Sequence, residues 1–315
     1  MEYVKLGDTD IEVSRICFGT LTVGPLQAGL PLREGADVLA YGVERGINFF
    51  DTAQLYETYP YIRRAMEQSG RWDLVISTKT YAYTRKLAAE AVEEARKALN
   101  RDYIDIFMLH EQESLSTLKG HREALEYLLE CREKGVIRAV GASMHHVAAV
   151  CGAMELALDV IHPLLNCGGL GIVDGTREDM ERILKQAHGQ GIGIFSMKPL
   201  GGGNLFKQAA ECLSYVRGLP FVDSVAIGMQ HPSEIDANLE FFAAGAFSKK
   251  AASTLSKRTR RLHIDDWCVG CGRCVKRCSQ AALHLEEGKA ECDHSRCILC
   301  GYCCKICPEW AIKVV

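Results

Sequence analysis

Eight cysteines near the end of the sequence have the spacing most specific to one kind of chemistry. They form two runs with the same spacing, C-x2-C-x2-C-x3-C: Cys268, Cys271, Cys274 and Cys278, then Cys297, Cys300, Cys303 and Cys307. This spacing is typical of two [4Fe–4S] clusters, in which the fourth cysteine of each run ligates the other cluster. Zinc is the alternative, because C-x2-C pairs also bind zinc, but a zinc site does not need this duplication.

The exchange of the fourth cysteine assigns each thiolate to one cluster. Cluster 1 is predicted to take Cys268, Cys271, Cys274 and Cys307, and cluster 2 is predicted to take Cys278, Cys297, Cys300 and Cys303. Pro308 follows the second run, whereas Ser279 stands at the same place after the first. A segment this short has too small a core to fold alone, so we expect it to need its metal.

Four polar residues in the first part of the chain could transfer a proton. Asp51, Lys79 and His110 fall at the ends of consecutive expected strands, and Tyr56 follows in the next loop. A free tyrosine has a pKa of about 10, which is high for an acid near neutrality. We expect the Lys79 ammonium, held by the Asp51 carboxylate, to lower the pKa of Tyr56, and His110 to orient a carbonyl oxygen.

Apolar runs that alternate with amphipathic stretches define the elements that must position these residues. Strands are expected at residues 15–19, 48–53, 74–79, 104–110, 137–143, 160–166, 193–199 and 224–228. Helical patterns lie between them, for example at 87–99 and at 123–134, where Gly135 ends the helix. Eight strand–helix units indicate an α/β fold, a (β/α)8 TIM barrel, with a hairpin at residues 3–13 that plugs one end.

The barrel segment resembles the aldo-keto reductase family. Residues 46–56, GINFFDTAQLY, are similar to that family's signature, and Ser77-Thr78-Lys79 and Leu109-His110 are similar to its later motifs. The resemblance implies that Asp51, Tyr56, Lys79 and His110 form the catalytic tetrad, with Tyr56 as general acid or base. The cysteine segment resembles bacterial ferredoxins, which implies a small C-terminal ferredoxin-like α+β iron–sulfur domain.

The same resemblance implies a nicotinamide dinucleotide, NADP or NAD, extended across the barrel mouth. The positions implied to contact it are Gly19, Thr20, Asp51, Ser143, Asn166, Met197, Lys198, Leu200, Gly201, Gly228 and Asn238. Ser143 and Asn166 would hold the carboxamide, residues 199–203 would admit the phosphates, and Lys198 could pair with one. Residues 228–238 contain no Lys or Arg, and Glu234 would repel the extra phosphate of NADP, which favours NAD.

Composition shifts divide the chain into three parts. We expect an aldo-keto reductase-like barrel at 1–245, a basic linker at 246–262 and the two-cluster domain at 263–315. The linker contains six cations and no acidic residue from 248 to 261: Lys249, Lys250, Lys257, Arg258, Arg260 and Arg261. A solvated linker or connecting helix is one interpretation, and a docking surface for an acidic electron-carrier protein is the other.

Composition also limits the class of protein. The 315 residues are 48% hydrophobic with a formal net charge of −3, which supports a full core and argues against nucleic-acid binding. No apolar run reaches membrane-spanning length and no signal-peptide pattern opens the chain, so neither a membrane partner nor export is expected. The seven cysteines outside the two runs are scattered, as reduced thiols are, and predict a cytoplasmic location.

The barrel segment and the cysteine segment both predict an oxidoreductase, but their implied cofactors transfer different numbers of electrons. A nicotinamide gives two electrons as a hydride, whereas each cluster passes one. The main prediction is an NAD(P)H-dependent enzyme of the aldo-keto reductase type that reduces an aldehyde or ketone, with Tyr56 as proton donor. The two clusters would either be coupled to this reaction or stabilise the protein. The alternatives are a ferredoxin-linked reductase or reductase subunit with optional nicotinamide, and an electron-transfer module with an idle barrel. A redox partner protein such as ferredoxin is expected wherever the clusters transfer electrons.

Overall fold

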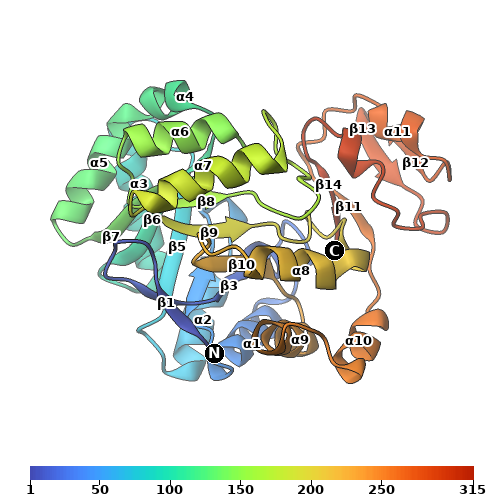
Figure 1. Ribbon diagram of the computed structural model, residues 1–315, viewed down its shortest axis with the longest axis horizontal. Helices are drawn as coiled ribbons and strands as arrows, with labels where there is room; N and C mark the ends of the chain where they lie inside the picture. Colours follow the sequence, from blue (N-terminus) through green and yellow to red (C-terminus); the bar gives the residue numbers. More distant parts are fainter.

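Eight parallel strands close into a barrel in the computed structural model, which describes residues 1–315 (Figure 1). The strands are β3 (Ile16–Gly19), β4 (Phe49–Asp51), β5 (Val75–Thr80), β6 (Ile104–Gln112), β7 (Ile137–Met144), β8 (Val160–Pro163), β9 (Gly193–Met197) and β10 (Ser224–Gly228). Neighbours in the chain are neighbours in the barrel, and β10 pairs with β3 to close it. The predicted (β/α)8 barrel is confirmed, with strand ends that differ by a few residues.

Amphipathic helices surround the barrel. They are α1 (Leu32–Glu44), α2 (Tyr59–Ser69), α3 (Arg85–Leu99), α4 (Leu115–Gly120), α5 (Arg122–Glu133), α6 (Val147–Glu155), α7 (Arg177–Gly189), α8 (Ala209–Arg217) and α9 (Pro232–Ala244). In α3 the buried positions recur every three or four residues, from Ala88 to Leu99, which places them on one face. Thr84 caps the start of α3 by accepting a hydrogen bond from the Leu87 amide.

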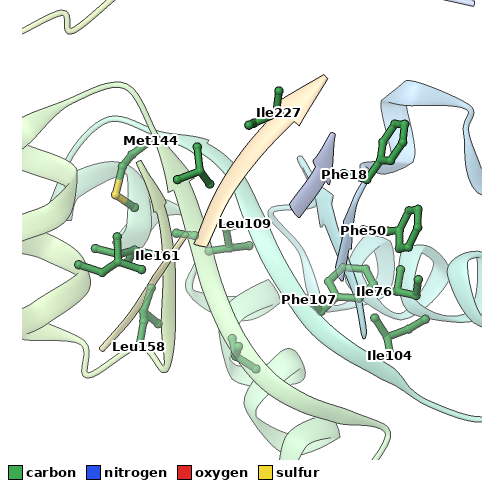
Figure 2. Packing of buried hydrophobic residues seen from close by; sticks show 14 of the residues in the cluster. Phe18, Phe50, Ile76, Ile104, Phe107, Leu109, Met144, Leu158, Ile161 and Ile227 are labelled. Atoms are coloured by element: carbon green, nitrogen blue, oxygen red, sulfur yellow. The ribbon is translucent and has the colours of Figure 1, made fainter. Parts of the chain in front are cut away.

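The core has an outer and an inner part. Outward-facing strand residues such as Phe18, Phe50 and Ile76 lie in the large cluster between strands and helices (Figure 2). The inner cluster fills the barrel with residues such as Phe49 and Phe195, whose rings lie 4.9 Å apart. Burial of such aromatic side chains contributes about 3–5 kcal/mol each when judged by truncation to Ala.

A hairpin closes the N-terminal end of the barrel. Strands β1 (Tyr3–Lys5) and β2 (Glu12–Ser14) pair antiparallel, and the buried Leu6 and Ile11 join the inner cluster. Gly7 has a φ of +56°, and a Cβ there would overlap the backbone of Gly193. Only glycine therefore allows this turn to lie against the barrel floor.

The C-terminal region forms a separate small unit at one side of the barrel (Figure 1). Helix α10 (Lys249–Ser256) leads to it, so the expected linker is helical for half its length. The unit contains β11 (Leu262–Ile264), α11 (Arg273–Arg277), β12 (Leu283–Glu286), β13 (Lys289–Cys292) and β14 (Ile312–Val314). Strand β11 pairs with β14, and β12 pairs with β13, both antiparallel.

The last strand of the unit docks directly onto the barrel. The Val314 amide donates to the Gly202 carbonyl at 3.0 Å, and the Asn204 side chain donates to the Ile312 carbonyl at 3.1 Å. Gly203 has a φ of +81°, and a Cβ there would overlap the Val314 carbonyl oxygen. The loop after β9 is thus shaped to receive the C-terminal strand. None of the helices has both the length and the apolar character needed to cross a lipid bilayer.

Candidate functional site

The four residues of the predicted tetrad meet at the C-terminal ends of the barrel strands. Asp51 ends β4, Lys79 lies in β5, His110 lies in β6, and Tyr56 lies in the short 3-10 helix Gln54–Tyr56. The Tyr56 hydroxyl lies 3.4 Å from Nε2 of His110, and Nζ of Lys79 lies 4.9 Å from the centre of the Tyr56 ring. Residues that are far apart in sequence therefore form one compact polar group.

The Lys79–Asp51 ion pair lies beneath this group, and only 1% and 5% of the two residues' surfaces are exposed. Nζ of Lys79 donates to both Asp51 oxygens, at 2.8 and 2.9 Å, and to the Thr52 carbonyl at 2.6 Å. Burial alone would raise the pKa of Asp51, but the charges of Lys79 and His162 outweigh it and lower that pKa to about 2.

The expected effect of Lys79 on Tyr56 is not found. Burial raises the pKa of Tyr56 well above its usual value, and the negative charges of Asp51 and Glu111 raise it further. The physical reason is that the Lys79 ammonium directs its hydrogens to Asp51 and Thr52. Tyr56 is therefore a neutral phenol at physiological pH. Burial, followed by the charge of Lys79, lowers the pKa of His110 well below its usual value, so His110 is also neutral.

His162 belongs to the same group and was missed in the sequence. It lies in β8, its Nδ1–H donates to the Phe195 carbonyl at 2.6 Å, and its Nε2 lies 3.6 Å from Asp51. The signal that could have identified it is a histidine at a strand end, the same signal that identified His110. Its position behind Asp51 depends on barrel closure, which the sequence does not display.

A single cavity of about 1330 Å³ extends from the tetrad to the C-terminal unit. Many of the predicted dinucleotide positions line it: Gly19, Asp51, Met197, Lys198, Leu200, Gly228 and Asn238. Its other walls include Trp310 and Lys313 of the C-terminal unit. The C-terminal unit therefore forms part of the site rather than a separate attachment.

Two predicted carboxamide contacts do not face this cavity. The Ser143 hydroxyl accepts a hydrogen bond from the Glu111 amide at 2.8 Å. The Asn166 side chain donates to the Leu170 carbonyl and accepts from the Leu170 amide, both at 2.9 Å. Both residues are completely buried, so their polar groups support loops of the barrel mouth. Thr20 likewise donates to the Asp51 carbonyl at 2.9 Å.

The glycine loop predicted to admit phosphates borders the large cavity and also contacts other parts of the chain. Gly201 packs against Leu170 and Leu205, while Gly202 and Gly203 lie against β14. Nζ of Lys198 lies 2.8 Å from Nε2 of His145. Burial and then the nearby charge of Lys313 lower the pKa of Lys198 to about 7.

The part of the cavity lined by Glu234 and Asn238 has cations that the local sequence does not provide. Nε of Arg258 and Nη2 of Arg260 each lie 3.9 Å from the Glu234 carboxylate. All three side chains are largely buried, with exposures of 33%, 22% and 19%. Two arginines of the expected linker fold back onto Glu234, so its carboxylate has counter-charges that residues 228–238 do not supply. The linker contains a connecting helix, α10, and Arg258 and Arg260 after it are only partly exposed.

The predicted cluster 1 cysteines surround a second, small cavity. Cys268, Cys271, Cys274 and Cys307 all line it. Backbone amides point at two of these four predicted ligands: Ala290 donates to the sulfur of Cys268 at 3.5 Å, and Ala311 donates to the sulfur of Cys307 at 3.4 Å. Amide hydrogen bonds of this type stabilise thiolates and cluster sulfur. Four cysteine sulfurs around one small cavity are the donor set that a [4Fe–4S] cluster takes.

The other cysteines also gather, although less tightly. Burial, together with the neighbouring Cys300 and Cys297, raises the pKa of Cys303 to about 12. Cys278 lies close to Cys292, a cysteine outside the two runs, and its sulfur accepts a hydrogen bond from Ala282 at 3.3 Å. These contacts fit the predicted cluster 2 ligands and identify Cys292 as a neighbour that the spacing did not indicate.

The barrel matches a known protein family. A model of the aldo/keto reductase family matches residues 15–211, which include the whole tetrad. The chain is 31% identical over 158 residues to aldo-keto reductase YhdN of Bacillus subtilis (strain 168), covering 45% of this chain and 47% of YhdN. It is 24% identical over 224 residues to L-galactose dehydrogenase of Arabidopsis thaliana, covering 66% of this chain and 68% of that protein. The chain thus spans about half the length of YhdN.

Solved structures show the same fold. The chain is similar to PA4992 of Pseudomona aeruginosa, with a TM-score of 0.66 and 23% identity over 77% of this chain and 95% of that chain. It is also similar to the holo form of aldo-keto reductase AKR11C1 of Bacillus halodurans, with a TM-score of 0.65 and 19% identity over 82% and 96% of the two chains. The two runs of cysteines lie beyond the residues matched by the family model.

Proposed function

Because the chain belongs to the aldo/keto reductase family, a family of oxidoreductases, we propose that it reduces an aldehyde or ketone with Tyr56 as the proton donor. The observation that carries this proposal is the contact between Tyr56 and His110 above the buried Lys79–Asp51 pair. Tyr56, His110 and Asp51 border a cavity large enough for both a substrate and a dinucleotide, since ligand sites commonly measure about 300–1,000 Å³.

The residues suggest how protons move. His110 and Tyr56 together hold the carbonyl oxygen, and the Tyr56 hydroxyl gives its proton as negative charge develops there. The raised pKa of Tyr56 does not prevent this transfer, because an alkoxide is a stronger base than a phenolate. Asp51 holds the Lys79 ammonium 4.9 Å from the centre of the Tyr56 ring; it does not lower the pKa of the resting phenol, and in this proposal it acts only on the phenolate that forms once the proton has left.

A nicotinamide dinucleotide fits this cavity in part. When bound, it would supply the hydride. Met197 and Gly19 line the end near Tyr56, and Arg258, Arg260 and Asn238 line the other end, where phosphates would find cations. The residues predicted to hold the carboxamide also support the barrel mouth, since Ser143 accepts a hydrogen bond from the Glu111 amide and Asn166 accepts one from the Leu170 amide. The two arginines favour NADP over NAD, which reverses the sequence-based preference.

The proposal includes two [4Fe–4S] clusters in a ferredoxin-like domain at 263–315. The cavity among Cys268, Cys271, Cys274 and Cys307, together with the amide–sulfur hydrogen bonds, supports the first cluster. The gathering of Cys278, Cys297, Cys300 and Cys303 supports the second. Anaerobically purified protein should contain about eight iron and eight sulfide ions per chain. Zinc in place of iron would contradict this part of the proposal.

A second candidate function is a ferredoxin-linked reductase or reductase subunit in which nicotinamide is optional. It is favoured by one observation: Cys304 and Cys307 of the C-terminal unit line the same cavity as Tyr56. The two candidates are separated by mixing anaerobic protein with NADPH and following the visible absorbance of the clusters. Carbonyl reduction without bleaching supports the first candidate. Reduction that requires a reduced ferredoxin, and not NADPH, supports the second.

A further inference from the structure

Cys307 is the one predicted cluster ligand that borders both cavities. It lines the small cavity together with Cys268, Cys271 and Cys274, and it lines the large cavity together with Tyr56. The predicted ligands of cluster 2 do not line the large cavity. A ligand bound in the large cavity can therefore reach a cluster 1 thiolate without crossing a protein layer.

The wall around Cys307 is fixed in place and aromatic. Trp310 follows it along the cavity, and its Nε1–H is buried without an acceptor in the structure. The Lys313 ammonium lies 5.0 Å from the Trp310 ring and 3.5 Å from the Asp265 carboxylate. Docking of β14 onto Gly202 prevents this wall from moving away from the barrel. An aromatic surface, a free N–H donor and a nearby cation suit a flat ring that bears carbonyl oxygens.

The iron–sulfur cluster, as the electron donor, limits the kinds of ring that could accept electrons in the large cavity. A [4Fe–4S] cluster gives one electron at a time, and an isolated aldehyde or ketone that accepts one electron becomes a radical of very high energy. A ring in which two carbonyl groups are conjugated spreads the added electron and avoids this cost. Quinones have this property, and the isoalloxazine of flavins, which also bears two carbonyl groups, delocalises a single electron over its conjugated ring nitrogens; a nicotinamide exchanges electrons as a pair.

We infer that the large cavity binds a conjugated dicarbonyl ring, of quinone or isoalloxazine type, against Cys307 and Trp310, and that electrons enter the ring through Cys307. The inference rests on the proposed function for Tyr56 and for the eight cysteines. It adds the class of ligand and assigns cluster 1 to the inner position and cluster 2 to the outer one.

For a quinone the reaction balances as follows. Two carbonyl groups take up two electrons and two protons and become two hydroxyl groups. Each cluster can hold one electron, so the two reduced clusters together store the pair. An external one-electron donor of the ferredoxin class, or dithionite in the laboratory, is oxidised to refill them. Tyr56 supplies the proton for the oxygen nearest His110, and water at the cavity mouth supplies the other.

Two exposed cysteines provide a matched pair of variants. Cys271 and Cys300 are each the second cysteine of their run, and each is exposed, but the first is assigned to cluster 1 and the second to cluster 2. Cys271→Ser and Cys300→Ser proteins are reduced with dithionite, freed of excess reductant and mixed anaerobically with 1,4-naphthoquinone. Ferricyanide, a small oxidant that needs no binding site, serves as the control oxidant.

The inference predicts that Cys300→Ser retains a fast reoxidation by naphthoquinone that saturates with quinone concentration. Cys271→Ser should lose this phase and still react with ferricyanide. Equal reoxidation of both variants by the quinone, or a rate that rises without saturation, would overturn the inference. Acid extracts of the purified protein distinguish the sources of the ring: a released flavin identifies a resident cofactor, and its absence together with saturable quinone reaction identifies a substrate.

A measurement on the unaltered protein covers the case in which either variant loses both clusters. Naphthohydroquinone cannot oxidise the clusters but has the shape of the product. Its addition to the fully reduced protein should change the electron paramagnetic resonance signal of one cluster and not of the other. An unchanged spectrum would overturn the inference. The proposed function is tested separately, since NADPH-dependent carbonyl reduction by Tyr56 requires neither result.

Discussion

Lys79 donates hydrogen bonds to both carboxylate oxygens of Asp51, and this ion pair is almost completely removed from solvent at the base of the site. A buried ion pair stabilises a protein only while both partners are present, because either charge alone is costly in the interior. The pair also sets the position of the ammonium below the Tyr56 ring. Fold stability and proton chemistry therefore depend on the same two residues.

Replacing Lys79 with Met should lower the free energy of unfolding by about 3–5 kcal/mol, because Asp51 would remain buried without a counter-charge. Urea unfolding followed by circular dichroism would measure this. The control is Asp73→Asn, which removes the exposed Arg71–Asp73 pair and should cost less than about 1 kcal/mol. Similar losses for the two variants would contradict the view that the Lys79–Asp51 pair is a buried structural element.

Lys198 should make the stability of the protein depend on pH in the alkaline range. Its pKa is lowered to about 7 in the folded protein, whereas an unfolded lysine has a pKa of about 10.4. Between these values the unfolded chain binds more protons, so stability should rise from about pH 7 towards pH 10 and fall as the pH returns to 7. Lys198→Met should reduce this rise, and Lys257→Met, which removes an exposed charge, should leave it intact. An equal rise in wild type and Lys198→Met would contradict the assignment.

The barrel and its tetrad were predictable from sequence because their signals are local. Each strand is a short apolar run, and Asp51, Lys79 and His110 each lie at a strand end, where the fold brings them together. His162 escaped notice although it has the same kind of position. Its role depends on closure of the barrel, which brings β8 opposite β4.

Contacts between distant parts of the chain could not be predicted in the same way. Ser143 and Asn166 are at the expected strand ends, but the conformations of the neighbouring loops engage their polar groups. Arg258 and Arg260 lie in a basic segment that looks solvated in sequence, yet α10 directs them back to Glu234. The fit between Gly203 and β14 joins residues more than a hundred positions apart.

Arg258 and Arg260 should determine which dinucleotide binds. Replacing both with Ala removes two cations near Glu234, and each lost hydrogen bond to a phosphate is worth about 1.5–3 kcal/mol. NADPH affinity should therefore fall by at least about tenfold, while NADH affinity changes little. Isothermal titration of the anaerobic protein would measure both. Lys257→Ala, an exposed neighbour, is the control, and an equal loss for NADH and NADPH would contradict a specific phosphate contact.

The central claim is that Tyr56 donates the proton to the carbonyl oxygen. The most direct measurement is the single-turnover rate of NADPH-dependent carbonyl reduction by Tyr56→Phe, which keeps the ring but removes the hydroxyl. Tyr83→Phe, at an exposed tyrosine away from the cavity, is the control. We predict a decrease of about 100-fold or more for Tyr56→Phe and none for Tyr83→Phe. An unchanged rate in Tyr56→Phe would contradict the account.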